Sequence, residues 1–227
     1  MEPLRNKSKD DEMEKMRILN SDPEKVNITY IKSPLCFYIK KVSQLFQDFE
    51  TRLQRFYEIN GMNKKISNPH INQLCVAKRE RGWSRAIVKR LDFDQNFIHL
   101  FFVDYGNEEV FPIESDHVIV CEIDEEFRDF PYMAMKCSLF GIKTKNDYER
   151  KKFTSFMLSE LENIKEVWVR LNSTRNDIYF VDIELRSNKI KRLDLKNRIF
   201  ERLSDQTVEK SACAQFDEEK RDFGKKL

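Results

Sequence analysis

The chain has 227 residues, of which 40% are hydrophobic and 35% charged, so it carries enough apolar side chains for one large domain or two small ones. Its 41 basic and 39 acidic residues leave a formal charge of +2, less than is usual for a dedicated nucleic-acid-binding protein. No apolar run approaches the roughly 18 residues that span a bilayer, and residues 1–7 lack the apolar stretch of a secretory signal. No membrane partner is therefore expected.

In chain order, residues 1–24 are charge-dense and predict a disordered or weakly helical lead-in. Residues 26–31 alternate in polarity and residues 35–40 follow a Ser-Pro turn, so both read as strands. A helix is predicted next, with Ser43 as its N-cap and Gly61 as a left-handed C-cap. Its apolar positions recur at steps of three and four: Val42, Leu45, Phe46, Phe49, Leu53, Phe56 and Tyr57.

After a polar linker at residues 62–70, the pattern changes to short strands separated by turn signals, which suggests a small barrel. These strands are expected at residues 73–78, 82–92, 96–105 and 107–111 and near Val118. Beyond a turn at residues 127–131, the predicted elements are strand 134–140, helix 146–161, strands 167–171, 178–185 and 189–193, helix 197–203 and a charged tail at 205–227.

The first and last parts are each too small to form a core alone, so we expect them to fold together with the barrel inserted between them. The fold class is mainly β with helices (α+β).

The cysteines and histidines predict no metal site and no disulfide framework. The cysteines are odd in number, lack a Cys-x-x-Cys pair and lie mostly among apolar neighbours, which favours buried thiols in a reducing compartment. The histidines are scattered, without ligand partners at metal-binding spacing. No cofactor is expected. The residues are Cys36, Cys75, Cys121, Cys137 and Cys213, with His70, His99 and His117.

The most informative segment is residues 98–107, an apolar, aromatic strand that stops at Asp-Tyr-Gly-Asn. Gly106 and Asn107 readily accept positive φ, so the strand should turn there. Phe102 and Tyr105 are three residues apart and converge only if the chain bends between them. With that bend, two aromatic faces and the Asn107 carbonyl can hold a flat cation such as an arginine side chain. The alternative is that both aromatics are ordinary core residues.

Three segments resemble an extended Tudor domain. They are the strand Trp-Ser-Arg-Ala at 83–86, the strand end Val-Asp-Tyr-Gly-Asn at 103–107, and the pattern Pro-x-x-Ala-x-x-Cys-x-Leu-x-Gly-Ile at 131–142. The flanking parts resemble the split nuclease-like OB-fold that wraps such barrels. The resemblance covers residues 25–204. It implies an SH3-like Tudor barrel at 72–125, inserted into a staphylococcal-nuclease-like OB-fold made of 25–60 and, with a linker, 126–204.

The resemblance implies a binding module and no enzyme. Extended Tudor domains are similar in reading arginine-containing peptides, often symmetrically dimethylated. Many occur in germline proteins that bind the N-terminal tails of Piwi-type Argonautes in the piRNA pathway of RNA-mediated gene silencing. We therefore expect a cytoplasmic peptide-binding adaptor, in perinuclear germ granules by resemblance.

The cage that the resemblance implies is incomplete. Of four aromatics and an asparagine, Phe102, Tyr105 and Asn107 match, whereas Ser84 and, counted without gaps, Lys78 replace two aromatic walls. Losing two walls removes about 1–3 kcal/mol of cation–π attraction. The prediction is thus arginine recognition with weak or no dependence on methylation, and a symmetric dimethylarginine reader is the alternative.

Neighbouring residues are expected to support this site. Asp104 should cap backbone N–H groups of the turn, and Gly106 should allow the bend. Arg85 is expected to form an internal salt bridge with Asp104. Trp83 is expected in the core, because neighbouring strand residues face opposite ways.

Other functions stay open at this stage. An RNA-binding OB-like module would use two basic patches, although solvated surface charge is the plainer interpretation. A nuclease needs clustered carboxylates, and residues 26–40 carry none. Self-association is compatible with the charged ends, which also suggest a piece of a longer protein. The two patches are Lys64, Lys65, Lys78, Arg79, Arg81, Lys89 and Arg90, and Lys189, Lys191, Arg192, Lys196 and Arg198.

Overall fold

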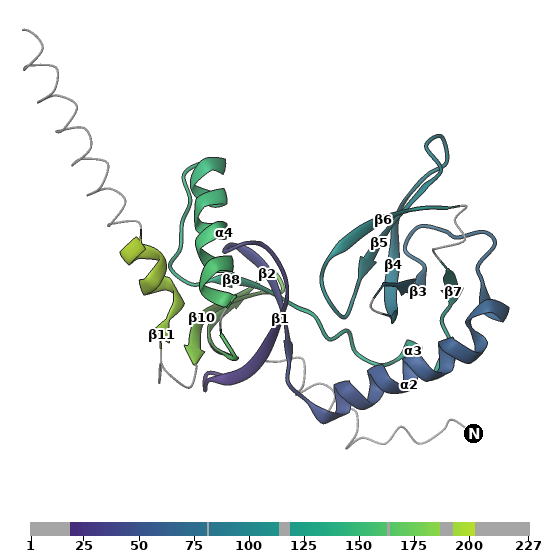
Figure 1. Cartoon of the computed structure of the whole chain (residues 1–227), viewed down its shortest axis with the longest axis horizontal. Helices are drawn as coiled ribbons and strands as arrows, with labels where there is room; N and C mark the ends of the chain where they lie inside the picture. Colours follow the sequence, from purple (N-terminus) through teal and green to yellow (C-terminus); the bar gives the residue numbers. More distant parts are fainter. Residues whose placement is uncertain (1–18, 81, 114–118, 163, 187–192, 203–227) are drawn as a thin grey trace, which may run out of the picture.

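The computed structural model describes residues 19–80, 82–113, 119–162, 164–186 and 193–202, and its strands form two sheets. Figure 1 shows them as two lobes, with the helix α2 running along the five-stranded lobe and α4 against the other. Most of the predicted lead-in, the tail, Arg81, Val118 and most of strand 189–193 lie outside the described residues. The strand expected near Val118 is observed just after it, at Val120–Glu122.

The six-stranded sheet joins the segments that come before and after the barrel. Its order is β11-β10-β8-β2-β1-β9, and β9 also pairs with β10, so the sheet closes on itself. Strands β8 and β10 run parallel, and the other pairs are antiparallel. The strands are β1 (Glu24–Ser33), β2 (Cys36–Lys41), β8 (Met135–Leu139), β9 (Glu166–Arg175), β10 (Ile178–Arg186) and β11 (Leu193–Asp194).

The core of this sheet contains Phe37, Ile39 and Val181, and the helix α4 (Asp147–Leu161) covers it with Phe153 and Met157. The Asn146 side chain accepts a hydrogen bond from the Glu149 N–H at 2.9 Å and so caps this helix. Residues 195–202 form the last described helix. Leu19 is only 2% exposed and belongs to this core, so the expected lead-in ends before it.

The five-stranded sheet forms the barrel, in the order β6-β5-β4-β3-β7. Alternate residues of β5, namely Ile98, Leu100 and Phe102, face its core, as the period of two predicts. The strands are β3 (Leu74–Arg79), β4 (Gly82–Asp92), β5 (Phe97–Phe102), β6 (Glu108–Pro112) and β7 (Val120–Glu122).

The helix α2 (Gln44–Asn60) packs on this barrel, although it was expected in the first part of the OB-fold. Its buried side chains, including Phe49 and Tyr57, share a core with Phe127 and with Trp83, which is 3% exposed as predicted. The short helix α3 (Glu125–Arg128) carries Phe127. Apolar burial thus attaches the helix to the barrel, while the preceding strands join the other sheet.

The end of α2 differs from the prediction. Gly61 has φ −59° in the right-handed helical region, and the chain continues into the 3₁₀ helix η1 (Gly61–Lys64). A Cβ atom at residue 61 would lie 2.6 Å from Cη2 of Trp83, closer than atoms can approach. Glycine is therefore required at this position by packing rather than by a left-handed cap.

The described cysteines Cys36, Cys75, Cys121 and Cys137 are all free thiols. Burial raises the pKa of Cys75 to about 12 and that of Cys121 to about 11. Within the described ranges, no His, Cys, Asp or Glu residues gather as a metal site. Among the same residues, no helix has the length and apolarity needed to cross a membrane.

Candidate functional site

The predicted site residues meet where β5 ends. The N–H groups of Tyr105 and Gly106 both donate to the Phe102 carbonyl, at 3.1 and 2.7 Å, and Gly106 has φ +83°. The Phe102 N–H in turn donates to the Asn107 carbonyl at 2.9 Å. This tight turn supplies the bend that brings Tyr105 and Asn107 back beside Phe102.

The turn also docks on the six-stranded sheet. A Cβ atom at Gly106 would lie 2.0 Å from Cγ of Tyr38 on β2, so only glycine allows this approach. The Thr29 hydroxyl on β1 donates to the Tyr105 carbonyl at 2.6 Å. The position of the turn is thus fixed by both lobes.

A pocket of about 410 Å³ opens beside the turn, between the barrel and β1. Tyr105, Asn107 and Ser84 all contribute to its walls. Its lining residues are Thr29, Tyr30, Arg79, Glu80, Ser84, Tyr105, Asn107, Glu109 and Phe111.

The aromatic part of this pocket already holds a guanidinium group, that of Arg79. Its central carbon lies 4.2 Å from the Phe102 ring centroid and 5.3 Å from that of Tyr105. The guanidinium forms an ion pair with Glu109, and the Arg79 side chain is only 15% exposed. Phe102 is fully buried in the barrel core and does not line the pocket itself, and the Arg79 guanidinium lies over its ring.

The strand register explains why Arg79, rather than Lys78, lies here. Lys78 pairs with Trp83 across β3 and β4, whereas the preceding Ala77 pairs with Ser84. Since side chains alternate along a strand, Arg79 shares a face with Ala77 and Ser84. The Lys78 Nζ lies 5.4 Å from the Trp83 ring centroid and 3.5 Å from Glu58 Oε2. The expectation that Lys78 replaces a cage wall is thus not met, whereas Ser84 does line the pocket.

Asn107 leaves an unmatched hydrogen-bond acceptor. Its Nδ2 donates to Glu109 Oε1 at 2.7 Å, and a carboxylate only accepts, so this contact fixes the orientation of the amide. The Asn107 Oδ1 atom is buried and has no donor within the described part of the chain. Leaving such an acceptor unmatched costs about 1–3 kcal/mol. An N–H donor on a ligand would remove this cost.

Tyr105 is held as a neutral side chain. Its hydroxyl donates to Glu50 Oε1 at 3.0 Å, and the Lys40 Nζ lies 2.6 Å from the same oxygen and 5.0 Å from the ring centroid. Burial raises the pKa of Tyr105, and the Glu50 carboxylate raises it further. The phenol therefore stays protonated at physiological pH, and the ring is tied to α2.

Asp104 serves the structure next to the pocket. It forms a two-pronged ion pair with the fully buried Arg85, at 2.9 Å (Nε to Oδ2) and 2.6 Å (Nη2 to Oδ1), as predicted. It was expected to cap the turn, but it accepts from the distant Met133 N–H at 3.1 Å. The N–H groups of Tyr105 and Gly106 already bond the Phe102 carbonyl, so the turn does not need that cap.

The family model for the Tudor domain matches residues 18–141. The chain belongs to the Tudor domain family. It is 34% identical over 124 residues to mouse (Mus musculus) Tudor domain-containing protein 1, which covers 52% of this chain and 10% of that protein. It is 29% identical over 163 residues to mouse Tudor domain-containing protein 6, covering 69% of this chain and 7% of that protein. The chain therefore spans a tenth or less of the length of these relatives.

Solved extended Tudor domains share the fold. The domain TD3 of mouse TDRD1, in complex with a MILI peptide containing dimethylarginine, has a TM-score of 0.69 at 19% identity, covering 82% of this chain and 93% of that one. The Drosophila melanogaster Papi domain, in complex with a Piwi N-terminal peptide, has a TM-score of 0.62 at 19% identity, covering 77% and 93%. The expected fold, a Tudor barrel within an extended Tudor domain, is confirmed.

Several residues around this Tudor pocket were missed by sequence reasoning. Arg79 and Glu109 could have been found, because Arg79 alternates with Ala77 on β3 and Glu109 lies two residues after Asn107 in the strand predicted at 107–111. Thr29 and Glu50 come from segments 76 and 55 residues away from Tyr105, and no local pattern links them to it.

Where the structure describes them, most cations of the two predicted basic patches pair with carboxylates. In the first patch, acidic partners pair with four of the cations, and Arg81 lies outside the described residues. In the second, Lys189, Lys191 and Arg192 are likewise outside them. The observed pairs are Lys64–Asp124, Lys78–Glu58, Arg79–Glu109, Arg90–Asp92, Lys196–Asp182 and Arg198–Glu160.

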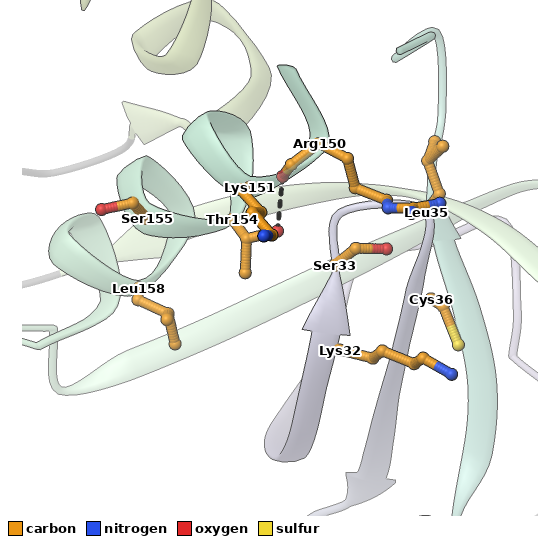
Figure 2. Close-up of a pocket in the computed structure, with 9 residues that line it drawn as sticks. All are labelled: Lys32, Ser33, Leu35, Cys36, Arg150, Lys151, Thr154, Ser155 and Leu158. Atoms are coloured by element: carbon orange, nitrogen blue, oxygen red, sulfur yellow. Dashed lines mark hydrogen bonds between the residues drawn. The ribbon is translucent and has the colours of Figure 1, made fainter. Parts of the chain in front are cut away.

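A second hollow, of about 670 Å³, lies in the OB-like lobe between the β1–β2 turn and α4 (Figure 2). Lys32 and Cys36 come from the turn side, and Lys151 and Leu158 from the helix. The Thr154 hydroxyl donates to the Arg150 carbonyl at 2.7 Å, within the helix itself. Its lining includes no aromatic residue from the described parts of the chain, and these residues therefore offer no ring to hold a flat cation.

Proposed function

We propose that this chain is a non-catalytic adaptor module that binds an arginine-containing peptide at the pocket of Phe102, Tyr105 and Asn107. One observation carries the proposal. The two rings already hold an unmethylated guanidinium, and beside them the buried side-chain oxygen Oδ1 of Asn107 lacks a donor in the described residues. An arginine side chain supplies both a flat cation and N–H donors.

We further propose that binding depends weakly or not at all on methylation. Glu109 lies at the guanidinium position and favours a cation that keeps all of its N–H donors. Methylation retains the charge but blocks donors. Its compensating gain comes from aromatic walls, and Ser84, which lines the pocket, supplies no ring.

The partner that we propose is the arginine-containing tail of a Piwi-type Argonaute. The extended Tudor domains of mouse TDRD1 and Drosophila Papi were solved with MILI and Piwi peptides, which supports this choice. A cytoplasmic location in germ granules belongs to the same proposal. Because the MILI peptide contains dimethylarginine and the Piwi peptide is symmetrically dimethylated, a symmetric dimethylarginine reader is the alternative.

Matched peptides test this function. Two glycine- and alanine-rich peptides with one central arginine, unmodified or symmetrically dimethylated, are titrated against the full chain by fluorescence anisotropy. We expect the two dissociation constants to agree within about threefold, a difference of less than 1 kcal/mol. A tenfold preference for the dimethylated peptide would establish the alternative.

Tyr105 variants locate the binding site. Tyr105→Ala should weaken both peptides about fivefold to thirtyfold, because it removes one cation–π contact in a mostly desolvated pocket. Tyr105→Phe is the matched control, since it keeps the ring and loses only the hydrogen bond to Glu50. If Tyr105→Ala binds as the unmodified protein does, the peptide does not use this pocket.

A further inference from the structure

We infer that Arg79 is a built-in competitor for the pocket, so that a peptide arginine binds only by displacing it. This inference rests on the proposed function and identifies a residue that sets the affinity of the site. Three observations support it: Arg79 occupies the aromatic position, it leaves the Asn107 Oδ1 atom without a donor among the described residues, and its ion pair is open to solvent.

Arg79 takes the features that a peptide arginine would use. Its guanidinium covers the Phe102 ring at 4.2 Å and lies 5.3 Å from the Tyr105 ring centroid, with Glu109 as its carboxylate partner. Glu50, the carboxylate bonded to the Tyr105 hydroxyl, is already paired with Lys40. A second guanidinium between the two rings would meet a like charge, and the remaining carboxylate of the pocket, Glu80, is exposed. The two arginines therefore exclude one another.

Arg79 fits this pocket incompletely. It leaves the buried Asn107 Oδ1 atom without a donor among the described residues. A peptide arginine, approaching from outside rather than from the end of β3, can place an N–H group on that oxygen while it replaces Arg79 at Glu109. The exchange then gains one hydrogen bond.

The position of Arg79 allows it to leave. It is the last residue of β3, next to the turn into β4, and among the described residues its side chain has a polar contact with Glu109 alone. The Glu109 side chain is 33% exposed, so solvent reaches this ion pair. Displacement needs only a side-chain rotation and no break in the strand ladder.

The competition lowers apparent affinity by the fraction of molecules whose pocket is open. If Arg79 fills the pocket nine-tenths of the time, its removal should strengthen binding about tenfold. The same argument predicts that peptides with several arginines, which raise the local arginine concentration, overcome the competitor more easily.

Arg79→Gln tests the inference with the unmodified one-arginine peptide and the full chain. We expect binding about threefold to tenfold tighter than that of the unmodified protein. Arg90→Gln is the matched control, because it removes the same charge from the same barrel. Arg90 lies near the end of β4 and, like Arg79, pairs with a carboxylate, that of Asp92. The control substitution should leave the affinity unchanged. Thermal unfolding of each variant confirms that it is folded.

The possible failures are separable. If Arg79→Gln binds equally or more weakly while Tyr105→Ala still weakens binding, the proposed function stands and the competitor is disproved. If Arg90→Gln strengthens binding as much as Arg79→Gln, the gain reflects overall charge and the competitor is again disproved. If neither Tyr105→Ala nor Arg79→Gln changes binding, the pocket is not the binding site and both proposals fail.

A second variant should gain affinity for the dimethylated peptide beyond the gain from removing the charge. Arg79→Phe replaces the cation by a ring beside Phe102 and Tyr105 and should bind the dimethylated peptide more tightly than Arg79→Gln does, about threefold or more. Equal binding by the two variants would show that residue 79 does not face the bound arginine.

Discussion

Two arginines on adjacent strands of the Tudor barrel are held in opposite ways. Arg85 is fully buried, pairs with Asp104 through two contacts and donates to the carbonyls of Phe127, Phe130 and Pro131 at 3.0, 2.5 and 2.9 Å. Arg79 also stacks on aromatic rings and pairs with a carboxylate, but it is partly exposed. The same chemical group is therefore structural in one place and exchangeable in the other.

The difference lies in hydrogen-bond saturation and solvent access rather than in aromatic contact. The Arg85 guanidinium carbon lies 4.6 Å from the Phe49 ring centroid, a distance similar to that between Arg79 and Phe102. Breaking a buried pair by removing one partner costs about 3–5 kcal/mol, whereas solvent-exposed pairs contribute about 0–1 kcal/mol. Variants of each region test this contrast.

The largest effect is expected at Arg85. Arg85→Ala leaves Asp104 buried without its partner and frees three carbonyls, so the free energy of unfolding should fall by about 3–5 kcal/mol. Urea denaturation measures this, with Arg90→Ala as the exposed control. A loss below about 1 kcal/mol would remove the distinction between the two arginines.

The turn that carries Tyr105 should be nearly as sensitive. Gly106→Ala adds a Cβ atom at φ +83° and 2.0 Å from Tyr38, so both backbone strain and a clash oppose it. Gly141→Ala is a matched control, since φ is +79° but a Cβ atom there would lie 3.6 Å from Lys196 Cδ, an ordinary contact distance. We expect about 1–2 kcal/mol for the control and clearly more for Gly106→Ala, measured by urea unfolding. Equal losses would show that the turn does not dock on β2.

Two tyrosines repeat the contrast on a smaller scale. Tyr57 lies in the same core as Phe49 and Phe127, which contact Arg85. Its hydroxyl donates to the Glu122 carbonyl at 2.7 Å and accepts from the Asp124 N–H at 2.8 Å. Tyr57→Phe should therefore cost about 1–3 kcal/mol, more than Tyr105→Phe, which loses one bond to a carboxylate that Lys40 also pairs with. Thermal unfolding of both variants ranks them, and a larger loss at Tyr105 would reverse the contrast.

The same tyrosines predict a loss of stability in alkali. Burial raises the pKa of Tyr57 and Tyr105 above the ordinary value of 10.0, so the folded state keeps protons that the unfolded state releases. Their contribution is therefore constant below pH 10 and is lost as the pH rises above it. Urea unfolding at about pH 8 to pH 11, on both sides of the ordinary tyrosine pKa, should show this fall in the free energy of unfolding. Tyr57→Phe should make the fall shallower. An unchanged slope in Tyr57→Phe would contradict this assignment.

The smallest effect on stability is expected at Arg79. Arg79→Gln removes one partly exposed ion pair and the guanidinium contacts with the Phe102 and Tyr105 rings, and it should lower the free energy of unfolding by about 1 kcal/mol. Urea unfolding of Arg79→Gln and Arg85→Gln, measured side by side, compares the two losses in the free energy of unfolding directly. A loss at Arg79 as large as that at Arg85 would mean that Arg79 is structural and does not exchange.

Local sequence patterns predicted much of this molecule. The Asp-Tyr-Gly-Asn bend, the Arg85–Asp104 pair and the buried Trp83 each depend on residues close in sequence or on a strand face, and all three are observed. What could not be predicted depends on register and packing. Counting back from Trp83 selected Lys78, but the ladder pairs Lys78 with Trp83 and leaves Arg79 on the pocket face.

Long-range contacts were also beyond the sequence. The close approach of Trp83 requires Gly61, and the attachment of Tyr105 to Thr29 and Glu50 joins three separate elements. No periodicity encodes these contacts, because each arises only when the two lobes and α2 pack together.

Displacement of Arg79 by a peptide arginine can be observed directly. In the full chain labelled with ¹⁵N, the Nε–Hε resonance of Arg79, assigned by its loss in Arg79→Gln, is followed while the unmodified one-arginine peptide is added. The resonance should leave its ring-shifted position and approach that of the exposed Arg90. The dissociation constant from this titration should equal the one measured by anisotropy. Saturation with peptide while the Arg79 resonance stays in place would contradict the account.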